Sequence, residues 1–224
     1  GICRDGADAA SRERKKGWMG RKIAKKYEIT SIAHPLYPQL HRIRALRDIR
    51  KDVRAGDLGG FVESEENLDQ KNSCWIFDNA LAAENSLVSG DAVLRDNAAA
   101  RGSATVAGRA RLEQNAAAED FAIVSSGLID GFAVIAGNSG IYENPLTGQA
   151  PAVTDRAVVY GELGGRIAVS GNAVILPGRK IDNPTADEIR ISHMGITVDR
   201  SDRQDLSPSQ PGSSQNKKYS EPER

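Results

Sequence analysis

Histidine is the residue in this chain that most readily performs acid–base chemistry, because the unperturbed pKa of its ring lies near neutrality. The sequence contains three histidines: His34, His41 and His193. A hexapeptide-type acyltransferase uses such a ring as the general base that deprotonates an acceptor hydroxyl or amine. His41 and His193 are therefore the candidate catalytic bases if the chain is an enzyme, and acetyl-CoA would then be the cofactor. None of the three lies within residues 74–176, which carry a sequence repeat, so we favour a non-catalytic role.

Other reactive groups are sparse. A β-helix carbonic anhydrase needs three histidines that converge on zinc, and the positions of these three argue against it. The sequence shows no phosphate loop, paired-cysteine metal site or serine-nucleophile elbow, so no metal site and no obligatory cofactor are expected. Cys74, beside Trp75, is interpreted as a small buried residue rather than a reactive thiol. With Cys3 as the only other cysteine, a disulfide framework is not expected and a reducing cytoplasm fits best.

A six-residue repeat begins after Cys74 and must position whatever site the chain carries. Small residues recur at every sixth position: Ala80, Ser86, Ala92, Ala98, Ala104, Ala110, Ala116 and Ala122. An apolar residue follows each of them two positions later: Ala82, Val88, Leu94, Ala100, Val106, Leu112, Ala118 and Val124. In this second series alanine, valine and leucine each return at every third step of the repeat. The spacing predicts a solenoid whose coils have three flat faces, one stacking alanines, one valines and one leucines.

Corner residues repeat with the same period. Asn79, Asn97 and Asn115 are separated from one another by three steps of the repeat, as are Gly90 and Gly108. Asparagine and glycine tolerate the left-handed backbone conformation that sharp corners require. We therefore assign these five residues to the corners of the coil.

The pattern predicts an all-β fold, a single-stranded parallel β-helix with three faces and 18-residue coils, a short N-terminal β cap and disordered tails. Its expected parts are a basic extension (1–25), a β cap (26–73), the β-helix (74–176) with a loop insertion at about 144–153, a C-terminal cap (177–200) and a tail (201–224). Strands are expected near residues 27–30 and 40–46 in the first cap, although Ile43, Leu46, Ile49 and Val53 equally fit one face of a helix. A strand pair is expected at 189–198 in the second. Phe61, Trp75 and Phe77 are expected to form a hydrophobic plug where the β-helix begins.

A family resemblance accompanies this pattern. Four segments resemble the entry motif of YdcK-like bacterial and prophage proteins: Val53-Arg54-Ala55-Gly56, Gly59-Gly60-Phe61-Val62, Asn67-Leu68, and Cys74-Trp75-Ile76-Phe77-Asp78 followed by Ala80. The resemblance covers about residues 26–176. It implies a short β segment leading into a left-handed β-helix of hexapeptide-like steps, and this family has been labelled an acyltransferase family by similarity of fold. It implies no catalytic residues.

The distribution of charge along the chain does not identify a binding partner. The formal net charge is zero, yet eight basic residues and one acid lie between Ser11 and Lys26, and a second basic stretch runs from Arg42 to Arg54. The acids and arginines that alternate along the repeat are interpreted as a mixed surface exposed to solvent. No run of apolar residues is long enough to span a membrane.

The leading hypothesis is a non-catalytic binding or scaffold module, of a prophage-accessory type, that contacts a protein partner or associates with itself. One alternative is the acyltransferase. The other is binding of nucleic acid or an anionic surface through the basic N-terminal region.

Overall fold

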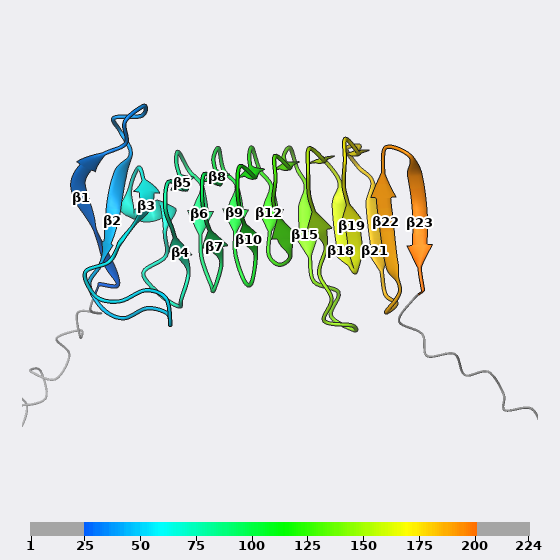
Figure 1. The fold of residues 1–224 in the computed structure, drawn as a ribbon, viewed down its shortest axis with the longest axis horizontal. Coiled ribbons are helices and arrows are strands. Elements are labelled where there is room, and N and C mark those ends of the chain that lie inside the picture. The colour runs from blue at the N-terminus through cyan, green and yellow to red at the C-terminus, as the bar shows by residue number, and fades with distance from the viewer. Residues whose placement is uncertain (1–24, 201–224) are drawn as a thin grey trace, which may run out of the picture.

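The computed structural model describes residues 25–200, and it is a rod of stacked β coils (Figure 1). The predictions of a disordered basic extension and a disordered tail fall on residues 1–24 and 201–224, outside the described residues. Within the described range the only helical segment is a 3₁₀ turn, η1 (Glu65–Asn67). The fold class is confirmed as an all-β parallel β-helix with three faces. Its left-handed sense stays a prediction that rests on the resemblance to hexapeptide-repeat proteins.

Three sheets run along the rod, one on each face. The nine-stranded sheet contains, in spatial order, β1 (Tyr27–Ala33), β2 (His41–Ala45), β3 (Leu58–Val62), β5 (Leu81–Ala82), β8 (Ala99–Ala100), β11 (Ala117–Ala118), β14 (Val134–Ile135), β17 (Val158–Val159) and β20 (Val174–Ile175). The eight-stranded sheet contains β4 (Trp75–Ile76), β7 (Val93–Leu94), β10 (Arg111–Leu112), β13 (Leu128–Ile129), β16 (Ala152–Val153), β19 (Ile167–Val169), β22 (Glu188–Ser192) and β23 (Gly195–Asp199). The six-stranded sheet contains β6 (Leu87–Val88), β9 (Thr105–Val106), β12 (Ile123–Val124), β15 (Gly140–Tyr142), β18 (Glu162–Gly165) and β21 (Lys180–Asn183). Consecutive groups of three strands, from β4–β6 (coil 1) to β19–β21 (coil 6), form the coils.

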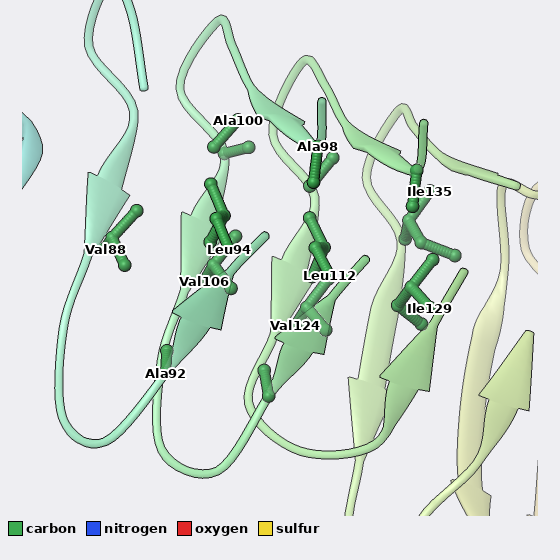
Figure 2. Packing of buried hydrophobic residues seen from close by; sticks show 14 of the residues in the cluster. Val88, Ala92, Leu94, Ala98, Ala100, Val106, Leu112, Val124, Ile129 and Ile135 are labelled. Carbon is green, nitrogen blue, oxygen red and sulfur yellow. The ribbon is translucent and has the colours of Figure 1, made fainter. Parts of the chain in front are cut away.

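Each short strand pairs in parallel with the strand one coil away, so like residues stack inside the rod. Leu94 pairs with Ile76 on one side and with Leu112 on the other, and all three are fully buried. Figure 2 shows the same stacking for the valine column, with Val88, Val106 and Val124 in successive coils. The expected alanine column is present at Ala82, Ala100 and Ala118, and it changes to Ile135, Val159 and Ile175 in the later coils. A narrow interior filled in this way needs few aromatic residues.

The corners correct part of the sequence prediction. Gly90 and Gly108 have positive φ, as expected. At the other predicted corner positive φ belongs to Asp78, Asp96 and Gln114, each one residue before the asparagine that was assigned there. A Cβ atom on Gly108 would lie 2.2 Å from the carbonyl oxygen of Ser125, so only glycine fits between those coils.

Acidic side chains explain why aspartate and glutamate are accepted at corners with positive φ. Asp96 Oδ2 accepts the backbone N–H of Gln114 in the next coil at 2.9 Å, and Glu84 Oε2 accepts that of Gly102 at 2.7 Å. The same bond recurs from Gly137 to Asp120 (2.9 Å) and from Gly171 to Asp155 (2.8 Å). These carboxylates satisfy corner N–H groups that no strand ladder reaches. Several acids that the sequence suggested were merely a mixed surface are therefore structural.

The N-terminal cap closes the first end of the rod. β1, β2 and β3 pair antiparallel, and β3 then joins β5 in parallel, so the cap continues the nine-stranded sheet. Tyr27 is fully buried, with its hydroxyl donating to the Leu68 carbonyl at 2.8 Å and its ring edge-on to Trp75. Phe61, expected in the same plug, instead joins a separate cluster on the outside of the sheet, and Phe77 is only partly buried beside the main core.

The C-terminal end is built differently. β22 and β23 form the expected strand pair, and they extend only the eight-stranded sheet. Ile196 and Val198 pair with Ile191 and Ile189 and are 67% and 51% exposed. The strand pair therefore leaves part of this end uncovered. Between β15 and β16 the chain leaves the coil as the insertion loop (143–151).

Candidate functional site

The two candidate bases lie at opposite ends of the rod. His41 begins β2 in the N-terminal cap, and its Nδ1 lies 3.2 Å from the carbonyl oxygen of Gln39. His193 lies in the turn between β22 and β23, where its ring packs beside Gly171. His34 accepts the backbone N–H groups of Leu36 and Tyr37 at its Nδ1, so it stabilises a loop. The fold brings these histidines into no common site.

The second basic stretch is largely occupied by contacts within the chain. Arg44 pairs with Glu28 at 3.3 Å and Arg54 with Asp48 at 3.0 Å. Arg42 stacks on the Phe61 ring at 4.4 Å and donates to three oxygen atoms of neighbouring strands and corners. An anion would have to compete with these contacts. The other basic region, residues 11–26, lies almost entirely outside the described residues.

Lys26 and Cys74 form a buried pair beneath the cap. The Lys26 ammonium donates to the carbonyl oxygens of Lys71 (3.1 Å) and Cys74 (3.0 Å) and lies 3.1 Å from the Cys74 sulfur. Burial raises the pKa of the Cys74 thiol, and the nearby ammonium opposes that rise only in part. The thiol is therefore protonated at neutral pH. This arrangement fits a buried structural residue better than a nucleophile.

A hollow of about 240 Å³ lies at the foot of the insertion loop, on the outside of the six-stranded sheet. Three acids line it, and each has a partner. Glu162 pairs with Lys180 at 3.1 Å. Asp182 accepts the side-chain N–H of Asn144 at 3.0 Å, and Glu143 pairs with Arg109. Because these contacts already hold the loop and its strands together, the hollow offers no free acid–base pair for catalysis.

The outer sides of the three sheets differ in polarity. The outward column of the eight-stranded sheet includes Arg111 and Arg190, and that of the six-stranded sheet includes Glu162 and Lys180. On the nine-stranded sheet every outward residue from β3 to β20 is apolar: Phe61, Leu81, Ala99, Ala117, Val134, Val158 and Val174. Along the described coils this is the one face whose outward column carries no polar side chain. A solvent-facing sheet normally alternates apolar and polar residues, so an apolar outer column indicates a covered surface.

At the N-terminal half of this face the cover belongs to the chain itself. Residues 34–40, the cap loop, connect β1 to β2 and project beyond those strands (Figure 1). Leu40 is buried with Phe61, Leu81, Ala83 and Ala99 in a cluster separate from the main core. The Arg101 guanidinium lies 5.9 Å from the centre of the Tyr37 ring, which extends the contact to β8. We call this half of the nine-stranded sheet the covered face.

At the C-terminal half, the described residues supply no such cover. This part, from β11 to β20, is called the open face and consists of Ala117, Val134, Val158 and Val174 with the flanking Phe132, Tyr160 and Leu176. Val174 and Leu176 are 52% and 57% exposed, and Phe132 is 59% exposed. Arg156 approaches the Phe132 ring at the rim. The sequence contained a signal for this surface, because valine precedes the inward residue at Val134, Val158 and Val174, where the two preceding coils of this sheet place Ala99 and Ala117.

Within residues 25–200 no three histidine, cysteine, aspartate or glutamate side chains gather as metal ligands. None of the helices in that range has the length and apolar character needed to cross a bilayer.

No protein-family model matches the chain, and a search of curated proteins finds no match.

Proposed function

We propose that the protein is a non-catalytic β-helix module that binds protein through the open face. The observation that carries this proposal is the apolar column of the nine-stranded sheet, which the cap loop covers over coils 1 and 2 and which no described segment covers over coils 3 to 6. The occupant we infer is an extended apolar segment of protein. The cap loop is itself an example of such a segment, and it occupies the adjoining part of the same face. Continuity with that contact is the reason to expect protein rather than a small ligand.

The surface has the properties of a binding site of modest size. Parallel coils with stacked cores are rigid, so little conformational entropy is lost when a partner binds. Strands lie about 4.8 Å apart, so the four strands from β11 to β20 span roughly 15 Å along the rod. This length matches a short extended segment rather than a large globular interface. The aromatic side chains at the rim, Phe132 and Tyr160, are residue types that interfaces favour.

The remaining sequence expectations are part of this proposal. A YdcK-like, prophage-type accessory protein in a reducing cytoplasm fits a buried, protonated Cys74 and a rod without an evident catalytic centre. The acyltransferase and anionic-surface hypotheses gain no support from the geometry. His41 and His193 lie off the coils, and the arginines of the stretch 42–54 discussed above already contact groups of this chain.

Selection of peptides from a displayed random library tests the proposal directly. We expect peptides rich in leucine and aromatic residues that bind the wild-type chain and lose binding to a Val158→Glu, Val174→Glu double variant. Thr105→Glu, on the outside of the six-stranded sheet, is the matched control and should retain binding. Selected peptides that bind the double variant equally well, or no selected peptides from a chain that is monomeric under the selection conditions, would overturn the proposal.

A thermal-shift scan with millimolar acetyl-CoA tests the enzyme alternative. A ligand that binds only the folded state raises the melting temperature. We expect no rise. A rise that disappears in His41→Ala or His193→Ala would instead favour the acyltransferase.

A further inference from the structure

We propose that the segment that covers the open face is the cap loop of a second copy of this chain, in a two-fold dimer whose rods run antiparallel. This inference rests on the proposed function, because it names the partner of the same face. It starts from a change in height along the outside of the nine-stranded sheet. Over β5 and β8 the face is raised by the cap loop, through Leu40 and Tyr37, and from β11 to β20 no segment within residues 25–200 covers it.

The tip of the cap loop presents an apolar group that the rest of the loop does not use. Leu36 is 77% exposed, although Leu40 of the same loop is buried. The loop is held in one shape by hydrogen bonds from the His34 N–H to the Leu40 carbonyl (2.8 Å) and from the Leu40 N–H to the Tyr37 carbonyl (2.9 Å). Pro35 and Pro38 further restrict it. A preformed loop with an exposed leucine loses little entropy on docking, which favours binding.

Symmetry places this tip over the bare end of the partner. In the parallel part of the sheet that follows the cap, β5 is the first strand and β20 is the last. A two-fold axis parallel to the strands, between β11 and β14, sets β5 opposite the partner's β20 and β8 opposite the partner's β17. The cap loop of each copy then lies between its own coils 1 and 2 and the partner's coils 5 and 6. Leu36 would face Val174 and Leu176, the exposed residues at that end.

Parallel rods would not fit this surface. They would bring one cap loop against the other and leave both open faces empty, whereas the antiparallel pair fills both with the same contact. Such an isologous interface is the commonest kind in soluble homodimers. Two reciprocal loop contacts also double the buried area, which a single short segment would leave well below the roughly 800 Å² per partner of a standard interface.

Charges along the face are compatible with the antiparallel arrangement. An axis parallel to the strands keeps each outward column opposite the same column of the partner. Arg101 beside β8 would then lie opposite Tyr160 beside β17, and Glu119 opposite Ala136. On the other flank Asn97 would lie opposite Arg156. No two like charges oppose each other in these pairs, so electrostatic repulsion does not disfavour the dimer.

Cysteine crosslinking of the full chain tests the arrangement. In a Cys3→Ser background, one chain carries Leu36→Cys and the other carries Val174→Cys, and the two are mixed and mildly oxidised. We expect a disulfide between the two chains. The control mixture of Leu36→Cys with Thr105→Cys should give none above background, since Thr105 lies on the outside of the six-stranded sheet. Crosslinking no stronger than this control, or crosslinking of Val174→Cys chiefly with itself, would overturn the antiparallel dimer.

Sedimentation equilibrium without added cysteines separates this inference from the proposed function. We expect the wild type to dimerise, and both Leu36→Asp and Val174→Asp to shift the equilibrium to monomer by at least about tenfold, the effect of 1.4 kcal/mol. If Val174→Asp alone weakens the dimer, the open face is an interface but the cap loop is not its partner. A wild type that stays monomeric overturns the dimer, and the peptide selection then decides independently whether the open face binds protein.

Discussion

The covered and open faces are two halves of one sheet with different neighbours. Both have an apolar outward column, and both rest on the same stacked interior. Leu81 in the covered face is 6% exposed because the cap loop lies over it, whereas Val174 in the open face is 52% exposed. The fold of a rigid solenoid therefore does not require its outward column to be apolar. The inward column supplies the core, so the outward column is available for contacts with other segments.

An introduced carboxylate should destabilise the covered face much more than the open face. Leu81→Glu places a carboxylate beneath the cap loop among Leu40, Phe61 and Ala99, and we expect it to lower the free energy of unfolding by about 3 kcal/mol. Val158→Glu, at the equivalent outward position of the open face, should lower it by less than about 1 kcal/mol, because the side chain reaches water. Urea unfolding measures both. Equal losses for the two variants would contradict the division into covered and open faces.

A second contrast lies within the cap loop. Leu40→Ala removes a side chain packed among Phe61, Leu81, Ala83 and Ala99, so we expect a loss of about 2–3 kcal/mol. Leu36→Ala, at the exposed tip, should change the free energy of unfolding of the monomer by no more than about 0.5 kcal/mol. Thermal or urea unfolding at low protein concentration gives both numbers. A stability loss from Leu36→Ala as large as that from Leu40→Ala would place the tip inside the fold of one copy.

A smaller loss of stability is expected for a substitution at the boundary between the covered and open faces. The Arg101 guanidinium lies 5.9 Å from the centre of the Tyr37 ring, at the boundary between the covered face and the bare strands. Arg101→Met keeps much of the apolar stem and removes the charge, so we expect a loss of about 0.5–1 kcal/mol. Limited proteolysis of the cap loop and urea unfolding both report it. A variant as stable as the wild type, with a loop no more sensitive to protease, would show that this contact does not hold the loop.

A substitution at Asp130, which lies outside the covered and open faces, is expected to give a small gain in stability. Partial burial raises the pKa of the Asp130 carboxyl, with Glu113 and Asp155 adding repulsion. A raised pKa means that the folded state disfavours the ionised form. The cost is therefore absent at low pH, where the carboxyl is protonated in both states, and is fully present above the folded-state pKa. Asp130→Asn should raise the melting temperature slightly at pH 7 and not at pH 3, while leaving association unchanged. A lower melting temperature at pH 7 would contradict this account.

Much of the fold was predictable because a short repeat fixes it. The inward residues Leu94 and Val106 each recur one coil later, at Leu112 and Val124, so the three faces follow from spacing alone. Asn79, Asn97 and Asn115 do lie in the corner turns, but the positive φ expected of them belongs to the residue before each one. The carboxylate bonds that favour Asp96 there depend on the next coil, and local sequence does not show them.

The open face was harder to predict because its period is irregular. Val134, Val158 and Val174 pair in register although their spacing along the chain is unequal, since the insertion loop lengthens one coil and the next coil is short. A search for one fixed period therefore misses them. The covered face could not be predicted from the sequence for another reason. The contact of Leu40 with Leu81 joins segments that only the folded cap brings together.

We propose that copies of the chain associate through the open face. Sedimentation equilibrium of the wild type, Val158→Glu and Thr105→Glu over a wide concentration range tests this. The account predicts that the wild type and Thr105→Glu associate reversibly and equally, and that Val158→Glu stays monomeric with unchanged secondary structure. Association that persists in Val158→Glu but is lost in Thr105→Glu would contradict it, because the interface would then lie on the outside of the six-stranded sheet.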